Sequence, residues 1–208
     1  TSTCPTVTFS ARRGTFPQTV TLDYGTAGCA DRNGRIRKGK IIVTYSDTLS
    51  RTNATKTVTF DAFSIDSVGV SGTRVWRNTG LNAQNQPTFS RTATNMRLSF
   101  TDGTSSTWSA THTIVKTAGI ATATPLDDEY RVSGSETGTN RRGTTATCTI
   151  TTPIVHRGNC PYPVSGVRSI TVNSNTRSLD FSHGGGDCDR TALLTKPDGT
   201  TRVVILRR

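Results

Sequence analysis

Thr57-Val58-Thr59-Phe60-Asp61-Ala62-Phe63 places an apolar residue at every second position up to residue 62. A period of two puts these side chains on one face of an extended strand and the polar ones on the other. Similar short runs, separated by turn residues, recur along the chain. We expect strands at Val7–Phe9, Thr19–Tyr24, Lys40–Tyr45, Lys56–Ile65, Thr73–Trp76, Thr88–Ala93, Met96–Phe100, Thr107–Lys116, Tyr130–Ser133, Thr144–Thr151, Val167–Val172, Ser178–Phe181, Thr191–Thr195 and Thr201–Leu206.

The composition agrees with this pattern. About a fifth of the 208 residues are threonine, a β-branched residue that suits a half-solvated strand, and the chain has a single Met. The one helical turn that we expect is Thr124 to Tyr130, where Thr124 can cap and Pro125 fits the first helical position. The sequence therefore predicts an all-β fold with almost no helix, an antiparallel β-sandwich or meander of many short strands.

Five cysteines stand in a chain without a C-x-x-C motif, which argues against a zinc ribbon or a thioredoxin-type site. Two stretches share an order of residues: a Cys-Pro, then Leu-Asp-aromatic, then a second Cys close to an Asp, and finally a β-branched strand. This order indicates an internal duplication, with related ends at 4–45 and 160–206. We predict the disulfides Cys4–Cys29 and Cys160–Cys188 with Cys148 free; the rival pairing joins Cys148 to Cys160.

A second motif recurs as Val70-Ser71-Gly72, Val132-Ser133-Gly134 and Val164-Ser165-Gly166, and we expect it to mark the same bend in successive β units. Asp102-Gly103 and Asp198-Gly199 indicate two-residue hairpin turns with positive φ at both central positions. We expect one all-β unit over residues 1–208. The alternative is two β-subdomains, about 1–85 and 86–208, divided where Asn82 to Gln86 interrupts the strands.

The motif LDYGTAGCADRNGRIRKGKIIV, residues 22–43, resembles uncharacterised secreted or surface lipoproteins of Bacteroidota bacteria. Shorter pieces around Asp127–Tyr130, Asn140–Gly143 and Gly186–Asp189 are similar to the same group. The resemblance implies a location outside the cytoplasm and carries no established activity. Disulfides form in oxidising compartments, so they too predict a secreted or cell-surface protein.

No catalytic residue and no cofactor is predicted. The run His183-Gly184-Gly185-Gly186 lacks the nucleophile elbow that an esterase would need, and the three histidines are far apart in sequence. The acids Asp127 to Glu129 and the pair Asp187 and Asp189 could bind calcium, but helix capping and turn formation explain them better. No metal ligand is therefore assigned.

The net charge of +11 favours polyanionic partners such as acidic polysaccharide, although a basic surface without a specific partner is the alternative. Aromatic residues make up only 6% and do not interleave with the cluster Arg35 to Lys40, which disfavours nucleic acid as a partner. No segment approaches the length of apolar residues that a transmembrane helix needs.

We expect a non-enzymatic structural protein of the cell surface, a filament or adhesive surface-layer subunit that self-assembles by β-strand pairing. The apolar run Val203-Val204-Ile205-Leu206 is the candidate assembly strand, and burial in its own core is the alternative for this run. The second functional hypothesis is a surface-exposed binding module for glycans or other polyanionic polymers. Thr48 and Ser67 lie in Asp-Ser/Thr-apolar patterns that suggest O-glycosylation.

Overall fold

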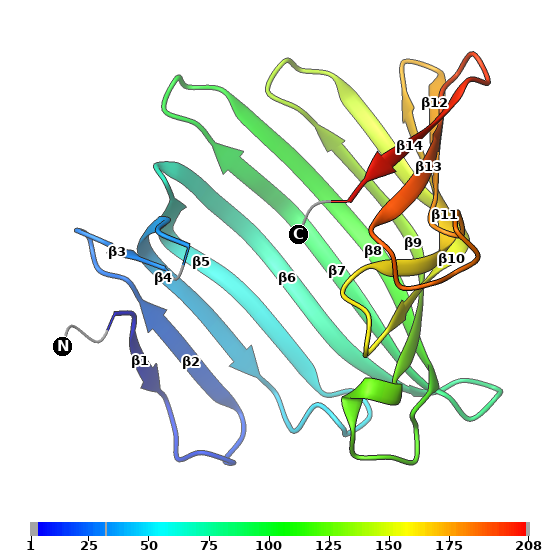
Figure 1. Cartoon of the computed structure of the whole chain (residues 1–208). Coiled ribbons are helices and arrows are strands. Elements are labelled where there is room, and N and C mark those ends of the chain that lie inside the picture. Colours follow the sequence, from blue (N-terminus) through cyan, green and yellow to red (C-terminus); the bar gives the residue numbers. More distant parts are fainter. Residues whose placement is uncertain (1–3, 32, 207–208) are drawn as a thin grey trace. The chain divides into compact units, whose positions relative to one another are not determined.

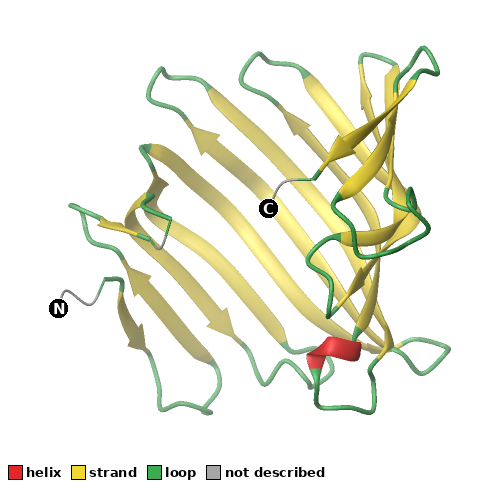
Figure 2. Ribbon diagram, in the orientation of Figure 1, coloured by secondary structure: helices red, strands yellow, loops and turns green. Residues whose placement is uncertain are grey.

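The computed structural model describes residues 4–31 and 33–206, and its regular secondary structure is almost entirely β-strand (Figures 1 and 2). The elements are β1 (Thr6–Phe9), β2 (Gln18–Asp23), β3 (Cys29–Ala30), β4 (Ile36–Tyr45), β5 (Thr55–Ile65), β6 (Val68–Leu81), β7 (Pro87–Ser99), β8 (Ser105–Ala118), the 3-10 helix η1 (Pro125–Asp127), β9 (Glu129–Thr139), β10 (Thr145–Arg157), β11 (Pro163–Val172), β12 (Asn175–Asp180), β13 (Thr191–Thr195) and β14 (Thr201–Ile205).

The fourteen strands form one antiparallel sheet whose order follows the chain, so the fold is the meander form of the all-β prediction. β3 alone lies off this path, where it pairs with β4. The expected helical turn is present as η1, and the Thr124 side chain accepts a hydrogen bond from the backbone N–H of Leu126. Within the described residues, no helix has the length and apolar character that crossing a bilayer would require.

Several strands are longer than the sequence pattern predicts. β6 has 14 residues where we expected four, and β7 joins two expected strands into one of 13 residues. In both strands polar side chains interrupt the alternation without ending the backbone pairing. Threonine and arginine tolerate a strand whose side chain faces water, so hydrophobic periodicity underestimates the length of a solvated strand.

The chain divides into two compact units. The first contains residues 1–79, 90–109 and 138–143, and the second contains residues 80–89, 110–137 and 144–208. The first unit holds the disulfide Cys4–Cys29, and the second holds Cys160–Cys188. Both pairings are those predicted, Cys148 is a free buried thiol, and the rival pairing of Cys148 with Cys160 is wrong.

In the first unit, strand register separates the side chains of one sheet into two chemically different faces. One face, which we call the apolar face, presents Val7, Phe9, Val20, Leu22, Ile41, Val43, Val58 and Phe60. The opposite face, which we call the threonine face, is polar apart from Ile42 and presents Thr6, Thr8, Thr21, Asp23, Lys40, Ile42, Thr44, Thr57, Thr59 and Asp61. The period-two pattern of the sequence is thus realised across four adjacent strands.

A bulge interrupts this register near the end of β5. Gly39 has φ 73° and Ala62 has φ 46°, and a Cβ on Gly39 would lie 2.2 Å from the Ala62 carbonyl oxygen. The extra residue turns Ala62 to solvent and buries Phe63, whose ring stacks on Phe60 at 5.7 Å. The alternation of residues 57–62 predicts that Ala62 is buried. This is wrong, because the bulge shifts the period by one residue and Phe63 is buried instead.

In the second unit, two apolar clusters form the core. One contains Ile154, Phe181 and Ala192, against which Val204 and Leu206 pack. The other contains Val155, Cys160 and Val164. The disulfide sulfur of Cys160 is thus part of a packed cluster and not only a covalent link.

The Val-Ser-Gly motif marks one recurring structure, as expected. Gly72, Gly134 and Gly166 have φ of 114°, 129° and 104°, which L residues with a Cβ rarely adopt. A Cβ on each would meet the backbone of the neighbouring strand at 2.1 to 2.7 Å. Glycine is required at these positions because the neighbouring backbone occupies the space of a side chain.

The Asp-Gly turns differ from the prediction. Gly103 and Gly199 have positive φ, but the preceding aspartates do not. Phe100 and Lys196 bond to the residue four positions ahead, so each hairpin has a three-residue loop that ends in a left-handed glycine. Asp102 and Asp198 instead accept a backbone N–H two residues on, at 3.0 and 2.9 Å.

Candidate binding groove and sheet edge

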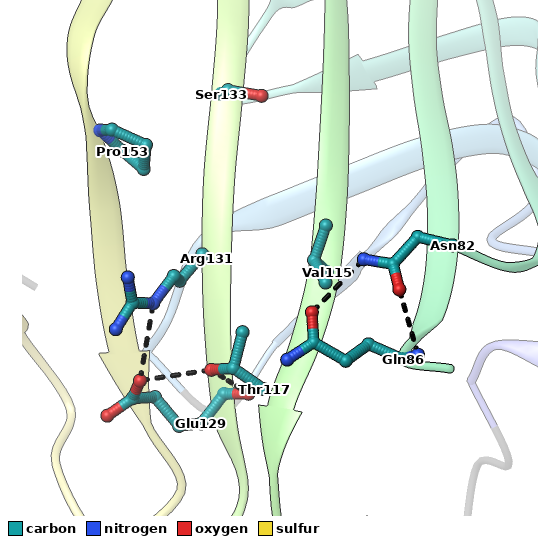
Figure 3. Close-up of a pocket in the computed structure, with 8 residues that line it drawn as sticks. All are labelled: Asn82, Gln86, Val115, Thr117, Glu129, Arg131, Ser133 and Pro153. Carbon is teal, nitrogen blue, oxygen red and sulfur yellow. Dashed lines mark hydrogen bonds and ion pairs between the residues drawn. The ribbon is translucent and has the colours of Figure 1, made fainter. Parts of the chain in front are cut away.

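The second unit contains a solvent-open groove of ≈ 500 Å³ (Figure 3). It lies across the ends of β8, β9 and β10 and the turn between β6 and β7. Its lining residues are mostly polar: Asn82, Gln86, Val115, Thr117, Glu129, Arg131, Ser133 and Pro153.

Three side chains of the same chain contact the Glu129 carboxylate. One carboxylate oxygen accepts a hydrogen bond from Thr117 Oγ1 at 3.0 Å and lies 3.5 Å from Arg131 Nε. The other lies 3.5 Å from Arg157 Nε. Figure 3 shows Thr117, Glu129 and Arg131 joined in this way. The carboxylate is therefore committed to donors of its own chain, whereas the Arg131 side chain keeps 56% of its surface exposed to solvent.

The turn at the other side of the groove is held by Asn82. Its side-chain oxygen accepts the backbone N–H groups of Gln84 and Gln86 at 3.0 and 2.9 Å. Its amide nitrogen donates to Gln86 Oε1 at 3.0 Å. The side-chain amides of Asn82 and Gln86 thus line the groove in fixed positions, because these three hydrogen bonds close the turn.

Directly next to Glu129 in sequence, a buried polar group fixes the start of β9. Lys116 Nζ lies 2.7 Å from Asp128 Oδ1, and the Tyr130 hydroxyl donates to Asp128 Oδ2 at 2.8 Å. The hydrogen bond from Lys116 holds the pKa of Asp128 below its ordinary value. Desolvation is the main cause that raises the pKa of Tyr130 to about 12, and the hydrogen bond to Asp128 is the second. All three residues are committed to one another, so this group has a structural role in aligning β8 with β9.

The predicted assembly strand is an edge of the sheet. β14 pairs with β13 and ends the strand order. Val204 and Leu206 face the core cluster, whereas Val203 and Ile205 are 51% and 64% exposed. Val204 and Leu206 thus pack in the protein's own core and Val203 and Ile205 face solvent, as the period of two requires, and assembly through this strand stays a prediction.

Thr48 and Ser67, the residues in the O-glycosylation patterns, lie in exposed turns. Ser67 follows Asp66, and both have positive φ in the tight turn between β5 and β6. Their modification stays a prediction.

Cys148 is buried, and burial raises the pKa of its thiol despite Arg168 Nε at 3.1 Å. The thiol therefore stays protonated and a poor nucleophile near neutral pH.

The sequence pattern did not lead us to the groove. Sequence reasoning weighs calcium binding for Glu129 and favours a role in helix capping, and it predicts no ligand for Arg131 or Ser133. The signal was present, since residues 129, 131 and 133 are polar and alternate with Tyr130 and Val132. That period of two places the three polar side chains on one face of β9.

In the described part of the chain, no group of three or more His, Cys, Asp or Glu side chains is placed to hold a metal ion. Comparisons with protein-family models, with curated proteins and with solved structures gave no match to this chain.

Proposed function

We propose that the protein is a non-enzymatic structural subunit of the cell surface that associates with itself through the open edge of β14. The observation that carries this proposal is the exposure of Val203 and Ile205 on an edge strand that Val204 and the following Leu206 anchor to the core. An exposed edge with apolar side chains is a template for pairing with another strand. The two disulfides and the likeness of residues 22–43 to secreted lipoproteins support a location outside the cytoplasm.

The sequence of β14 suits pairing with its own copy. A two-fold axis through Val203 would make the two strands antiparallel, which is the slightly more stable arrangement. It would set Val203 opposite Val203, Arg202 opposite Val204 and Thr201 opposite Ile205. No like charges face each other across such a pair, so neither copy opposes the contact.

The test introduces a charge at the edge. We expect Val203→Lys to abolish association in light scattering at high protein concentration, because an edge lysine is a common block to strand pairing. Val7→Lys is the matched control, since Val7 is 46% exposed on β1, the strand at the other end of the sheet order. Circular dichroism should show the same strand content for both. A wild-type protein that is monomeric at every concentration would exclude the proposal.

A second function, a binding module for glycans or other polyanionic polymers, is favoured by the groove. The exposed Arg131 guanidinium and the Ser133 hydroxyl can donate hydrogen bonds to a carboxylate or hydroxyl of a ligand. The groove lining includes no aromatic residue, so hydrogen bonds and charge, not ring stacking, would hold the ligand. We expect Arg131→Gln to weaken binding of polygalacturonate fragments in calorimetry, and Arg142→Gln, an exposed arginine outside the lining, to leave it unchanged.

A further inference from the structure

Within the first unit, the apolar face is incompletely covered: Val20, Leu22, Ile41, Val58 and Phe60 are half-buried, and two residues on β1 are exposed. Phe9 and Val7 are 54% and 46% exposed, and Val43, at 9%, is the one buried member of its eight residues. None of the eight belongs to the two core clusters described above. A sheet that is apolar on one face and polar on the other is stable only when another surface covers the apolar one.

The charged residues on the apolar face are cations, and they favour an anionic surface as its cover. Arg74 lies opposite Val58, and Lys56 lies opposite Tyr45 and Trp76, so both cations extend from the apolar face. The acids of the same strands, Asp23 and Asp61, belong to the threonine face. Among the residues that register places on the apolar side of β1, β2, β4, β5 and the paired part of β6, none is acidic.

This distribution disfavours a second copy of the chain as the cover. A copy stacked face to face would bring a second set of the same cations to a patch without carboxylates to neutralise them. An anionic amphiphilic surface has the opposite effect, since each lysine or arginine near it contributes attraction. The apolar centre and cationic border match the combination that peripheral membrane proteins use.

We propose that the apolar face binds the surface of an anionic phospholipid bilayer. Phe9 and Val7 enter the boundary between headgroups and acyl chains, and Lys56 and Arg74 contact the lipid phosphates. The backbone of β2, β4 and β5 is paired on both sides, so these strands present side chains and not free N–H groups to the lipid. This inference does not depend on β14, which lies in the second unit.

The experiment is flotation of the full chain with two kinds of vesicle, one of phosphatidylglycerol and phosphatidylcholine in equal parts, the other of phosphatidylcholine alone. We expect flotation with the anionic vesicles at low salt, and loss of most of it at high salt. The double variant Val7→Ser with Phe9→Ser should bind at least about tenfold more weakly, because it removes two apolar side chains that lie in the lipid. Both residues are exposed, so the variant should keep its circular dichroism spectrum.

The cations of the apolar face have a matched control on the opposite face. Lys56→Gln with Arg74→Gln removes two charges from the apolar face, and Lys40→Gln with Arg77→Gln removes two from the opposite one. We expect the first pair alone to lower binding to anionic vesicles. Equal binding by the two pairs would overturn the proposal, as would a wild-type chain that does not float. A concentration-dependent dimer that Val7→Ser with Phe9→Ser dissociates, without vesicle binding, would assign the face to a second copy instead.

Discussion

The two disulfide-closed ends of the chain carry the same sequence elements and use one of them in the same way. In each, the Asp of the Leu-Asp-aromatic triplet accepts the backbone N–H two residues on: Asp23 from Gly25 and Asp180 from Ser182, both at 2.8 Å. The aromatic residue after this Asp is buried in both, at 9% exposure in the first unit and 6% in the second. The repeated residues therefore specify a repeated local structure, a strand that ends in an Asx turn and a buried ring.

The two ends differ in the strands that come after the second cysteine. In the first, β4 pairs with β2 along one edge and with β5 along the other. In the second, β13 stands between β12 and β14, and β14 is left at the edge. The second end has one more strand, β13, before its β-branched run. That run is therefore an edge strand, whereas the corresponding run in β4 is an interior strand. Position in the sheet, and not the apolar run itself, therefore decides whether such a strand can recruit a partner.

The largest expected difference between the ends concerns their disulfides. Their loops span 25 and 28 residues, so loop closure alone should contribute about 3.5 kcal/mol in each case. Cys160 is buried between Val155 and Val164, whereas Cys4 and Cys29 are half-buried. Replacing Cys160 and Cys188 by serine should therefore cost about 1 kcal/mol more than replacing Cys4 and Cys29, because it also puts a hydroxyl into an apolar cluster. Urea unfolding of the two double variants measures the difference, and equal costs would show that Cys160 contributes only its covalent bond.

A smaller difference should appear when the repeated β-branched strands are truncated. Val43 lies on the interior strand β4 and is buried, while Val204 lies on the edge strand and is partly buried. Val43→Ala should lower the free energy of unfolding by about 1 to 2 kcal/mol, and Val204→Ala by less than about 1 kcal/mol. The change in urea midpoint tests this order. A larger cost for Val204→Ala would mean that β14 is as well packed as β4, and it would weaken the contrast between edge and centre.

The strands, the disulfides and the 3-10 turn could be predicted from sequence, because each depends on neighbouring residues or on a short repeated pattern. Prediction failed where the outcome depends on pairing between distant strands. Asp66-Ser67 and Asn173-Ser174 form tight turns with positive φ at both positions, the geometry that we expected for Asp-Gly pairs. Asp and Asn tolerate this conformation, but the serines carry no such signal, so the register of the flanking strands must impose it.

The candidate sites show the same limit. The period of two in β9 predicts its polar groove residues, but the groove also needs Asn82 from the turn between β6 and β7 and Pro153 from β10. The apolar face likewise consists of short alternations in four strands, none of them conspicuous alone. In both cases the side chains could be assigned to a face from sequence, whereas the surfaces they form together required the strand order.

The smallest expected difference lies in how the two ends hold the aspartate that comes soon after the second cysteine. Backbone N–H donors lower the pKa of both from 3.8, mainly Asn33 for Asp31 and Thr191 for Asp189. Lowered carboxyl pKa values mean stability that is complete above the unfolded value and lost as pH falls below about 4. The side chains that add a further hydrogen bond differ: Arg37 donates to Asp31, and the Thr191 hydroxyl donates to Asp189 at 2.9 Å. In carboxyl titrations by NMR, Arg37→Gln should therefore raise the midpoint of Asp31 only, and Thr191→Val that of Asp189 only. If either substitution moved both midpoints, the two turns would be coupled, and the ends could no longer be compared as independent copies of one structure.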